Sequence, residues 1–210
     1  MKKFIISFWI TLSLMLEHLM FKLGALKYFD FTDMTWNDSL ENMGGFTSIA
    51  YFAPWQDIEE WPTLPANPTT DEQMVTLEGN FTMKTDKHFI QVYVSPATAE
   101  LNANNQGETD GQSFRNEGEF FYPGSKVECR AFARKINNSR GVTILIDGDG
   151  DRTCIGTEML PCFFKPTLNY GKVAADRKGL VVQFFQDHFV PGLIYKGSIP
   201  LDGSTIPEQS

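Results

Sequence analysis

The chain has 210 residues, of which 42% are hydrophobic and 13% aromatic, and its formal net charge is −8. This apolar content can build a core, so a wholly disordered chain is excluded, and the length allows one large or two small domains. The acidic balance argues against a protein that grips nucleic acid, because phosphate binding needs clustered Lys and Arg.

The first segment of the chain has two lysines followed by an apolar run from Phe4 to Leu16. It has the outline of a secretion signal or anchor, but it is shorter than a membrane-spanning helix and no good cleavage site follows it. The other interpretation is an upstream extension or a structural arm. We therefore separate an apolar leader, extension or arm over 1–27 from a single β domain over 28–210.

From Tyr28 onward the chain has the composition of a β protein. The segment 75–83 alternates between apolar and polar residues and predicts one strand, and 113–122 predicts a weaker strand. Further predicted strands are FTSIAYF, HFIQVYV, GVTILID, TCIG, CFFKPTL, GLVVQFF and GLIYKGSI. Roughly eight to ten short strands separated by turn residues indicate a mainly β fold, an antiparallel β-sandwich or barrel.

One segment departs from the strand pattern. Ser125 and Glu128 have the spacing of a capping box, and the apolar residues that follow have a helical period. This pattern predicts one flanking α-helix over about residues 126–137, with Phe132 and Ile136 facing inward.

Two long loops, 53–73 and 95–112, complete the predicted domain. The first contains four prolines, which exclude a central strand, and two tryptophans. Trp55 and Trp61, exposed on such a stiff arm, would suit a protein–protein interface, where aromatic residues are enriched. The alternative is that they fold back onto their own sheet.

The sequence contains no catalytic motif: G-x-S-x-G, H-E-x-x-H, a Walker loop and G-x-G-x-x-G are all missing. His88 and His188 are isolated and are predicted to be structural. We therefore expect no enzymatic activity, no catalytic residue and no cofactor. The three cysteines, Cys129, Cys154 and Cys162, lack zinc-site spacing; free half-buried thiols are predicted, with a Cys154–Cys162 disulfide as the alternative.

The stretch "ILIDGDGDRTCIGTE" contains a possible metal site. Asp147, Asp149, Asp151 and Glu158 fall at positions 1, 3, 5 and 12, which is the ligand spacing of a calcium loop. Position 6, normally glycine, is Arg152, and a strand pattern precedes the loop where a helix is needed. We therefore favour a hairpin with an Asp-Gly turn, and keep the four carboxylates as weak calcium candidates.

Four stretches in chain order carry a resemblance to a known family. They are "YFDFTDMTWNDSLENMGGF", "GETDGQSF", the stretch from "GEFFYPGSKVECR" to "GLVVQFF", and a closing "GLIYKGSI". In the third stretch a strand, a Pro-Gly turn and a short helix precede the Asp/Gly hairpin, another strand, a "GKVAADRKG" turn and a last apolar strand. This order resembles the tail-tube and related structural proteins of long-tailed bacteriophages over roughly 28–199.

The resemblance implies a non-enzymatic virion protein whose protomers pair edge strands into rings, which stack into a hollow tail tube. The implied partners are further copies of the chain and other phage tail proteins. DNA would pass through without sticking, and no stable membrane partner is implied. The implied location is the phage tail, after assembly in the host cytoplasm. The loops 53–73 and 95–112 would be the candidates for ring-to-ring contacts.

The alternative hypothesis is a secreted or surface-anchored β-sandwich that binds a ligand such as a glycan, assisted by calcium in the acidic turn. In that case the leader is a true signal, and the protein is secreted or belongs to the cell envelope. A β-rich hydrolase with an unrecognised site ranks last.

Overall fold

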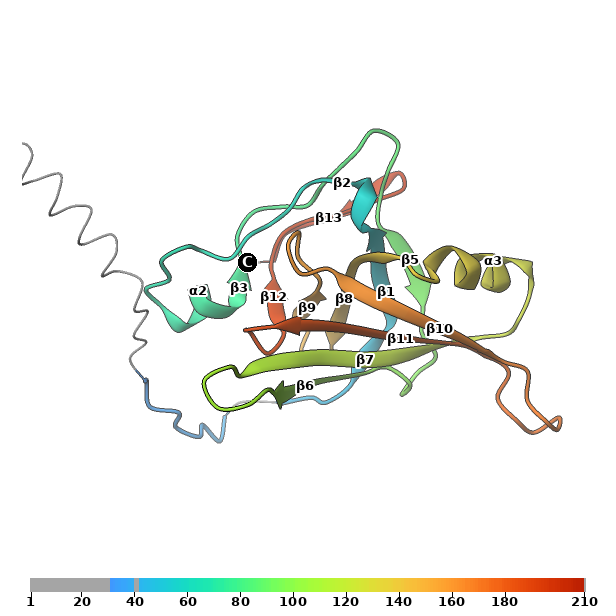
Figure 1. Ribbon diagram of the computed structural model, residues 1–210, viewed down its shortest axis with the longest axis horizontal. Coiled ribbons are helices and arrows are strands. Elements are labelled where there is room, and N and C mark those ends of the chain that lie inside the picture. Colours follow the sequence, from blue (N-terminus) through green and yellow to red (C-terminus); the bar gives the residue numbers. More distant parts are fainter. Residues whose placement is uncertain (1–30, 40–41, 210) are drawn as a thin grey trace, which may run out of the picture. The chain divides into compact units, whose positions relative to one another are not determined.

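The computed structural model describes residues 31–39 and 42–209, and the predicted leader over 1–27 lies outside them (Figure 1). Contacts divide the chain into two compact units, Met1–Leu40 and Glu41–Ser210. In the described part of the first unit, the indole Nε1 of Trp36 donates to the carboxylate of Asp38 over 2.6 Å. The fold and the sites discussed below belong to the second unit.

The second unit is built mainly of strands, which confirms the predicted mainly β fold. In chain order its elements are β1 (Phe46–Pro54), the 3-10 helix η1 (Trp55–Asp57), β2 (Ile58–Glu60), α2 (Asp71–Val75), β3 (Thr76–Leu77), β4 (Thr82–Met83), β5 (Ile90–Tyr93), β6 (Glu100–Gln106), β7 (Ser113–Pro123), α3 (Val127–Ile136), β8 (Arg140–Asp147), β9 (Arg152–Ile155), β10 (Cys162–Asn169), β11 (Gly179–His188), β12 (Leu193–Tyr195), β13 (Ile199–Leu201) and β14 (Ser204–Ile206). Among these described strands every pair is antiparallel except β3 with β12.

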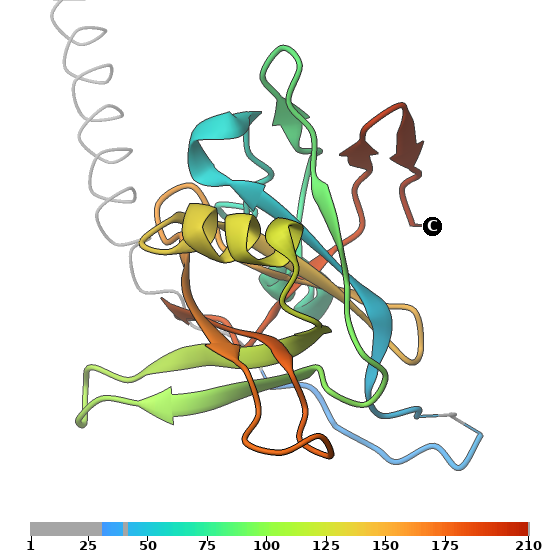
Figure 2. The ribbon, with the colours of Figure 1, turned by 90° about the vertical axis from the view of Figure 1, so that its right-hand side faces the viewer.

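Ten of the strands form one sheet, in which β8 is central because it pairs with β1, β9 and β10. Beyond β10 the order continues through β11, β7 and β6, and beyond β1 it continues to β5. The backbone N–H of Ser95, just after β5, donates to the carbonyl of Phe121 in β7 over 2.9 Å. This bond joins the β5 side of the sheet to β7 and curls the sheet into a partly closed barrel (Figure 2).

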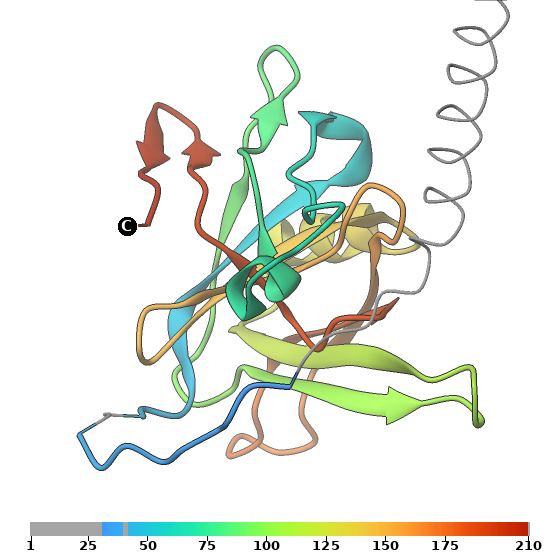
Figure 3. The same ribbon diagram turned by 90° about the vertical axis from the view of Figure 1, so that its left-hand side faces the viewer.

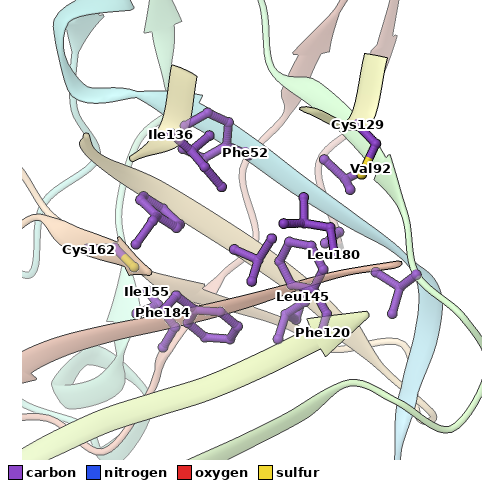
Figure 4. Packing of buried hydrophobic residues seen from close by; sticks show 14 residues of the cluster. Phe52, Val92, Phe120, Cys129, Ile136, Leu145, Ile155, Cys162, Leu180 and Phe184 are labelled. Carbon is purple, nitrogen blue, oxygen red and sulfur yellow. The ribbon is translucent and has the colours of Figure 1, made fainter. Parts of the chain in front are cut away.

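Two apolar clusters lie on opposite faces of the central strands. Along β1, Ala50 and Phe52 belong to the first cluster, and Tyr51 and Ala53 belong to the second. The same alternation along β8 buries both faces of each strand, which explains their nearly continuous apolar sequences. The first cluster fills the interior of the barrel (Figure 4).

Helix α3 covers the first cluster, as predicted. Ile136 is buried, and the ring of Phe132 meets that of Phe52 edge-on at a centroid distance of 6.0 Å. The predicted capping box is wrong, because the N-cap residue is Lys126, which makes no side-chain cap bond. Ser125 is therefore one residue too early to cap, and its carbonyl instead accepts a hydrogen bond from Nε of Arg130 over 2.9 Å.

The prediction of one strand over 75–83 is also wrong. The start of this segment belongs to α2, which is capped by the side chain of Thr70. The short strands β3 and β4 follow, and they pair with different partners. Between them Gly79 has a φ of +93°, which breaks the extended chain. Leu77 and Phe81 both reach the second cluster, but they do so from a bent chain.

The two predicted long loops contain regular structure. The segment 53–73 holds the end of β1, η1, β2 and the start of α2, and the segment 95–112 holds β6. Strand β6 has the sequence ELNANNQ and is mostly exposed, so no apolar alternation marks it. It forms a hairpin with β7, which at 11 residues is the longest strand among the described residues rather than a weak one.

Candidate functional site

The acidic turn is a hairpin tip, as favoured from the sequence, because β8 and β9 pair directly on either side of it. The carboxylate of Asp147 accepts hydrogen bonds from the backbone N–H groups of Asp149 and Asp151, at 3.0 and 2.9 Å. The carboxylate of Asp149 accepts from the N–H of Met43 at 2.9 Å. Strand β9 carries Glu158 away from this turn, and no metal-binding group of His, Cys, Asp and Glu is found among the described residues.

Removing the turn-capping carboxylate is expected to weaken the fold without involving a metal. Asp147→Ala should lower the free energy of unfolding by about 1–2 kcal/mol, because two turn amides lose their acceptor. Asp147→Asn keeps an acceptor oxygen and should stay within about 0.5 kcal/mol of the wild type. Calcium or a chelator should shift the wild-type Tm by less than about 1 °C. A drop of several degrees with chelator would restore the calcium hypothesis.

Trp55 and Trp61 pack against each other, with ring centroids 6.3 Å apart. The indole Nε1 of Trp55 donates to the carbonyl of Glu158 over 3.0 Å, and the guanidinium of Arg140 lies 4.6 Å from the Trp55 ring centroid. Trp61 meets Phe81 of the second cluster at 5.6 Å. Both tryptophans therefore fold back onto their own domain, and a role for them in an interface stays a prediction.

The three cysteines are free and buried, so the alternative Cys154–Cys162 disulfide is wrong. The reason is topological: Cys154 belongs to the second cluster and Cys162 to the first, on opposite faces of the sheet. Burial raises the pKa of both thiols, which keeps them protonated and unreactive in the folded protein.

The outer edge of β6 is the most extended open edge of the sheet. Within the described part of the chain, β6 pairs only with β7, so its other edge carries unpaired backbone groups. Its middle residues, Asn102 to Asn105, are exposed. Exposed edges are usually protected by Lys, Pro or a bulge, but Glu100 is the only charged residue of β6 and the strand has no proline.

A second candidate surface is an apolar cavity of about 400 Å³ at the end of the β10–β11 hairpin. The β9–β10 loop and the turn after β11 both line it, and each presents an exposed apolar side chain: Met159 is 89% exposed and Phe189 is 67% exposed. The helix α2 and strand β3, whose Leu77 also lines the cavity, face the viewer in Figure 3.

Two buried amide side chains hold these turns in place. Gln186, 1% exposed, accepts from the N–H of Gly156 at 3.1 Å and donates to the carbonyl of Leu160 at 2.6 Å. Asn116 is also buried, and it donates to the carbonyl of Val190 at 3.0 Å and accepts from the N–H of Gly192 at 3.0 Å. The exposed apolar residues are therefore presented on fixed turns.

His188 lines the same cavity but is itself buried, and its Nδ1 accepts from the N–H of Val190 over 3.0 Å. Burial lowers the pKa of His188 from its ordinary value of 6.5. The imidazole is therefore neutral in the folded protein near pH 7. The cavity thus has a neutral histidine, one carboxylate from Glu158, and no Lys or Arg among its lining residues.

His188 is expected to make stability depend on pH. Because its pKa is lower in the folded chain, the unfolded chain binds the proton more readily, so this contribution is complete above the unfolded value of about 6.5 and is lost as the pH falls below it. Urea midpoints between about pH 7.5 and 5.5 should fall less steeply for His188→Gln than for the wild type. Equal slopes would contradict this assignment.

No helix among the described residues is long and apolar enough to span a membrane. A scan against protein-family models finds no match, and searches of curated proteins and of solved structures also find none. Two candidate surfaces have been described: the polar backbone edge of β6, and the apolar cavity with fixed walls beside Met159 and Phe189. Neither β6 nor the clamping amides stood out in the sequence: Gln186 follows the apolar run GLVVQFF and precedes Asp187, so nothing in the sequence separates it from the exposed Gln183.

Proposed function

We propose that this protein is a non-enzymatic structural subunit that associates with copies of itself into rings, which stack into the tail tube of a long-tailed bacteriophage. The observation that carries the proposal is the unprotected outer edge of β6. Seven residues of backbone are available there for pairing, and the neighbouring side chains are mostly uncharged amides. Such an edge favours strand addition by another chain.

A second strand, β5, offers a shorter complementary edge, because Phe89 and Ser95 at its two ends already donate to Pro200 and Phe121, and only the stretch between these bonds is open. Among the described strands it pairs only with β1, and three of its four residues are exposed. Pairing β6 of one copy with β5 of the next uses two different surfaces. Such a heterologous contact repeats from copy to copy, and it closes into a ring when the rotation per subunit fits. Pairing of β6 with β6 would instead give an isolated dimer.

The charge of the chain also supports a conduit for DNA. A net charge of −8 repels phosphate, so DNA inside a ring of such subunits would pass without binding. The proposed partners are therefore other copies of this chain and further tail proteins, and the proposed location is the virion tail after assembly in the host cytoplasm.

Lysines on the β6 edge are expected to abolish ring formation. Ala103→Lys/Asn105→Lys places two charges on exposed residues of β6, where pairing with another strand would bring them against it. Light scattering and negative-stain images should show rings for the wild type and monomers for this variant. Its Tm should stay within about 3 °C of the wild-type monomer, because exposed substitutions rarely destabilise.

Ser204→Lys/Thr205→Lys adds the same charge to exposed residues of the small hairpin formed by β13 and β14, and it serves as the matched control. This control should still form rings. Wild-type protein that remains monomeric at high concentration would refute the proposal, and so would rings that tolerate the β6 substitutions.

A further inference from the structure

The β10–β11 hairpin has exposed apolar residues at both of its ends. At one end lies the cavity with Met159 and Phe189, and at the other end the turn 170–178 exposes Tyr170 and Val173, the latter at 65%. The two ends face opposite sides of the domain: the turn faces the viewer in Figure 2, and α2 and β3 beside the cavity face the viewer in Figure 3. Strand β11 has 10 residues, or roughly 33 Å of extended chain, so the two ends cannot meet within one copy.

The turn 170–178 has a defined conformation. The carboxylate of Asp176 accepts from the backbone N–H groups of Lys172 and Val173 at 2.6 and 3.1 Å, and these bonds lower the pKa of Asp176. The N–H of Gly171 donates to the side chain of Asn169 over 3.0 Å. A preordered turn loses little conformational entropy when it docks.

We propose that this turn of one copy docks into the apolar cavity of a second copy, so that Val173 meets Met159 and Phe189 head to tail. The inference rests on the proposed function, and it assigns the surfaces through which rings stack. Of the two loops expected from the sequence to make that contact, 53–73 contributes Pro62, Thr63 and Leu64 to the cavity, and the turn 170–178 takes the place of 95–112.

Charge favours the same pairing. The turn carries Lys172 and Lys178 against the single acidic Asp176, whose carboxylate is already used within the turn. A third basic residue, Arg177, lies 4.6 Å from the ring centroid of Phe121 in its own domain. The cavity is lined by Glu158 and by no Lys or Arg. A basic turn and a cavity that carries a carboxylate attract each other, whereas two turns or two cavities do not.

The direction of the contact also fits. Strands β6, β7, β11 and β10 lie side by side and antiparallel (Figure 1). Pairing at the β6 edge therefore adds copies across the strands, and docking at the hairpin ends adds copies along them. Two perpendicular contacts of this kind are what rings and their stacking require.

A cysteine trap in the full chain tests the contact. Met159→Cys and Val173→Cys, one of them tagged, are mixed under assembling conditions and oxidised with copper phenanthroline. The native cysteines are buried and do not compete. A disulfide needs Cα atoms within about 7 Å, so the cross-linked pair should exceed the pair of Met159→Cys with Ser204→Cys by roughly tenfold.

The variant Met159→Lys provides a second test, because it places a positive charge opposite the basic turn 170–178 of the docking copy. Rings without stacks are expected, with mean tube length falling roughly tenfold. Normal tubes with this variant, or equal cross-linking to position 204, would overturn the docking contact and leave ring formation intact. Cross-linking of Met159→Cys to Met20→Cys would assign the cavity to the N-terminal segment instead. Protein that never forms rings would overturn both this contact and the proposed function.

Discussion

Phe184→Ala is expected to lower the free energy of unfolding by about 3–5 kcal/mol, the largest effect of any single truncation considered for this protein. Phe184 is 1% exposed, and its ring packs against Phe120 in the barrel interior at a centroid distance of 6.2 Å. It also fills the space above Gly118, where an added Cβ would lie only 2.7 Å from its Cζ. Because the surrounding strands are fixed by pairing on both sides, the cavity left behind cannot collapse.

Urea denaturation measures this loss, at a protein concentration where light scattering shows monomers. The matched control is Phe189→Ala, five residues along the same segment and 67% exposed, which should stay within about 0.5 kcal/mol of the wild type. A loss below about 1 kcal/mol for Phe184→Ala would show that the barrel interior is not packed as described.

Gln186→Leu is expected to lower the free energy of unfolding by about 1–3 kcal/mol, because it leaves the buried backbone N–H of Gly156 without its acceptor. The carbonyl of Leu160 also loses the Gln186 amide, but it still accepts from the backbone N–H of Thr157 over 2.9 Å. The glycine itself has a φ of +121°, so the loop depends on this clamp to hold a conformation that few residues adopt.

A second replacement of glutamine by leucine on β11 provides the control. Gln183 is exposed and donates to the carboxylate of Glu119 over 3.2 Å, so Gln183→Leu should change stability by no more than about 0.5 kcal/mol. Equal effects of the two leucines in urea denaturation would mean that the clamp does not hold the β9–β10 loop. The Gln186→Leu variant should also lose the cysteine trap at Met159, since the loop that presents this residue is released.

The sequence predicted the elements in which the pattern of apolar residues matches the burial of their side chains. β1 and β8 are almost continuously apolar because both faces are buried, and α3 has the helical spacing of Phe132 and Ile136 over the first cluster. The hairpin after β8 follows from its Asp-Gly turn. In each case local pattern and final packing agree, which is the condition under which periodicity is informative.

The elements that the sequence did not predict are those whose structure depends on distant partners. β6 has only Leu101 and Ala103 as apolar residues, too few to predict a strand, and its pairing with β7 makes it one. The segment 75–83 alternates like a strand, yet Gly79 bends it and its apolar residues reach the core separately. The cavity was also missed, because Met159 and Phe189 come together only through two separate amide clamps.

Labelling of the three buried thiols can report local and global unfolding of the protein. Cys129 lies on the buried face of α3, whereas Cys154 and Cys162 lie within the sheet, so a thiol reagent reaches the helix thiol and the sheet thiols only after different parts of the fold have opened. Labelling at Cys129 alone would mark detachment of the helix, and labelling at all three would mark global unfolding. The order in which the reagent reaches them would therefore separate local from global stability without any added probe.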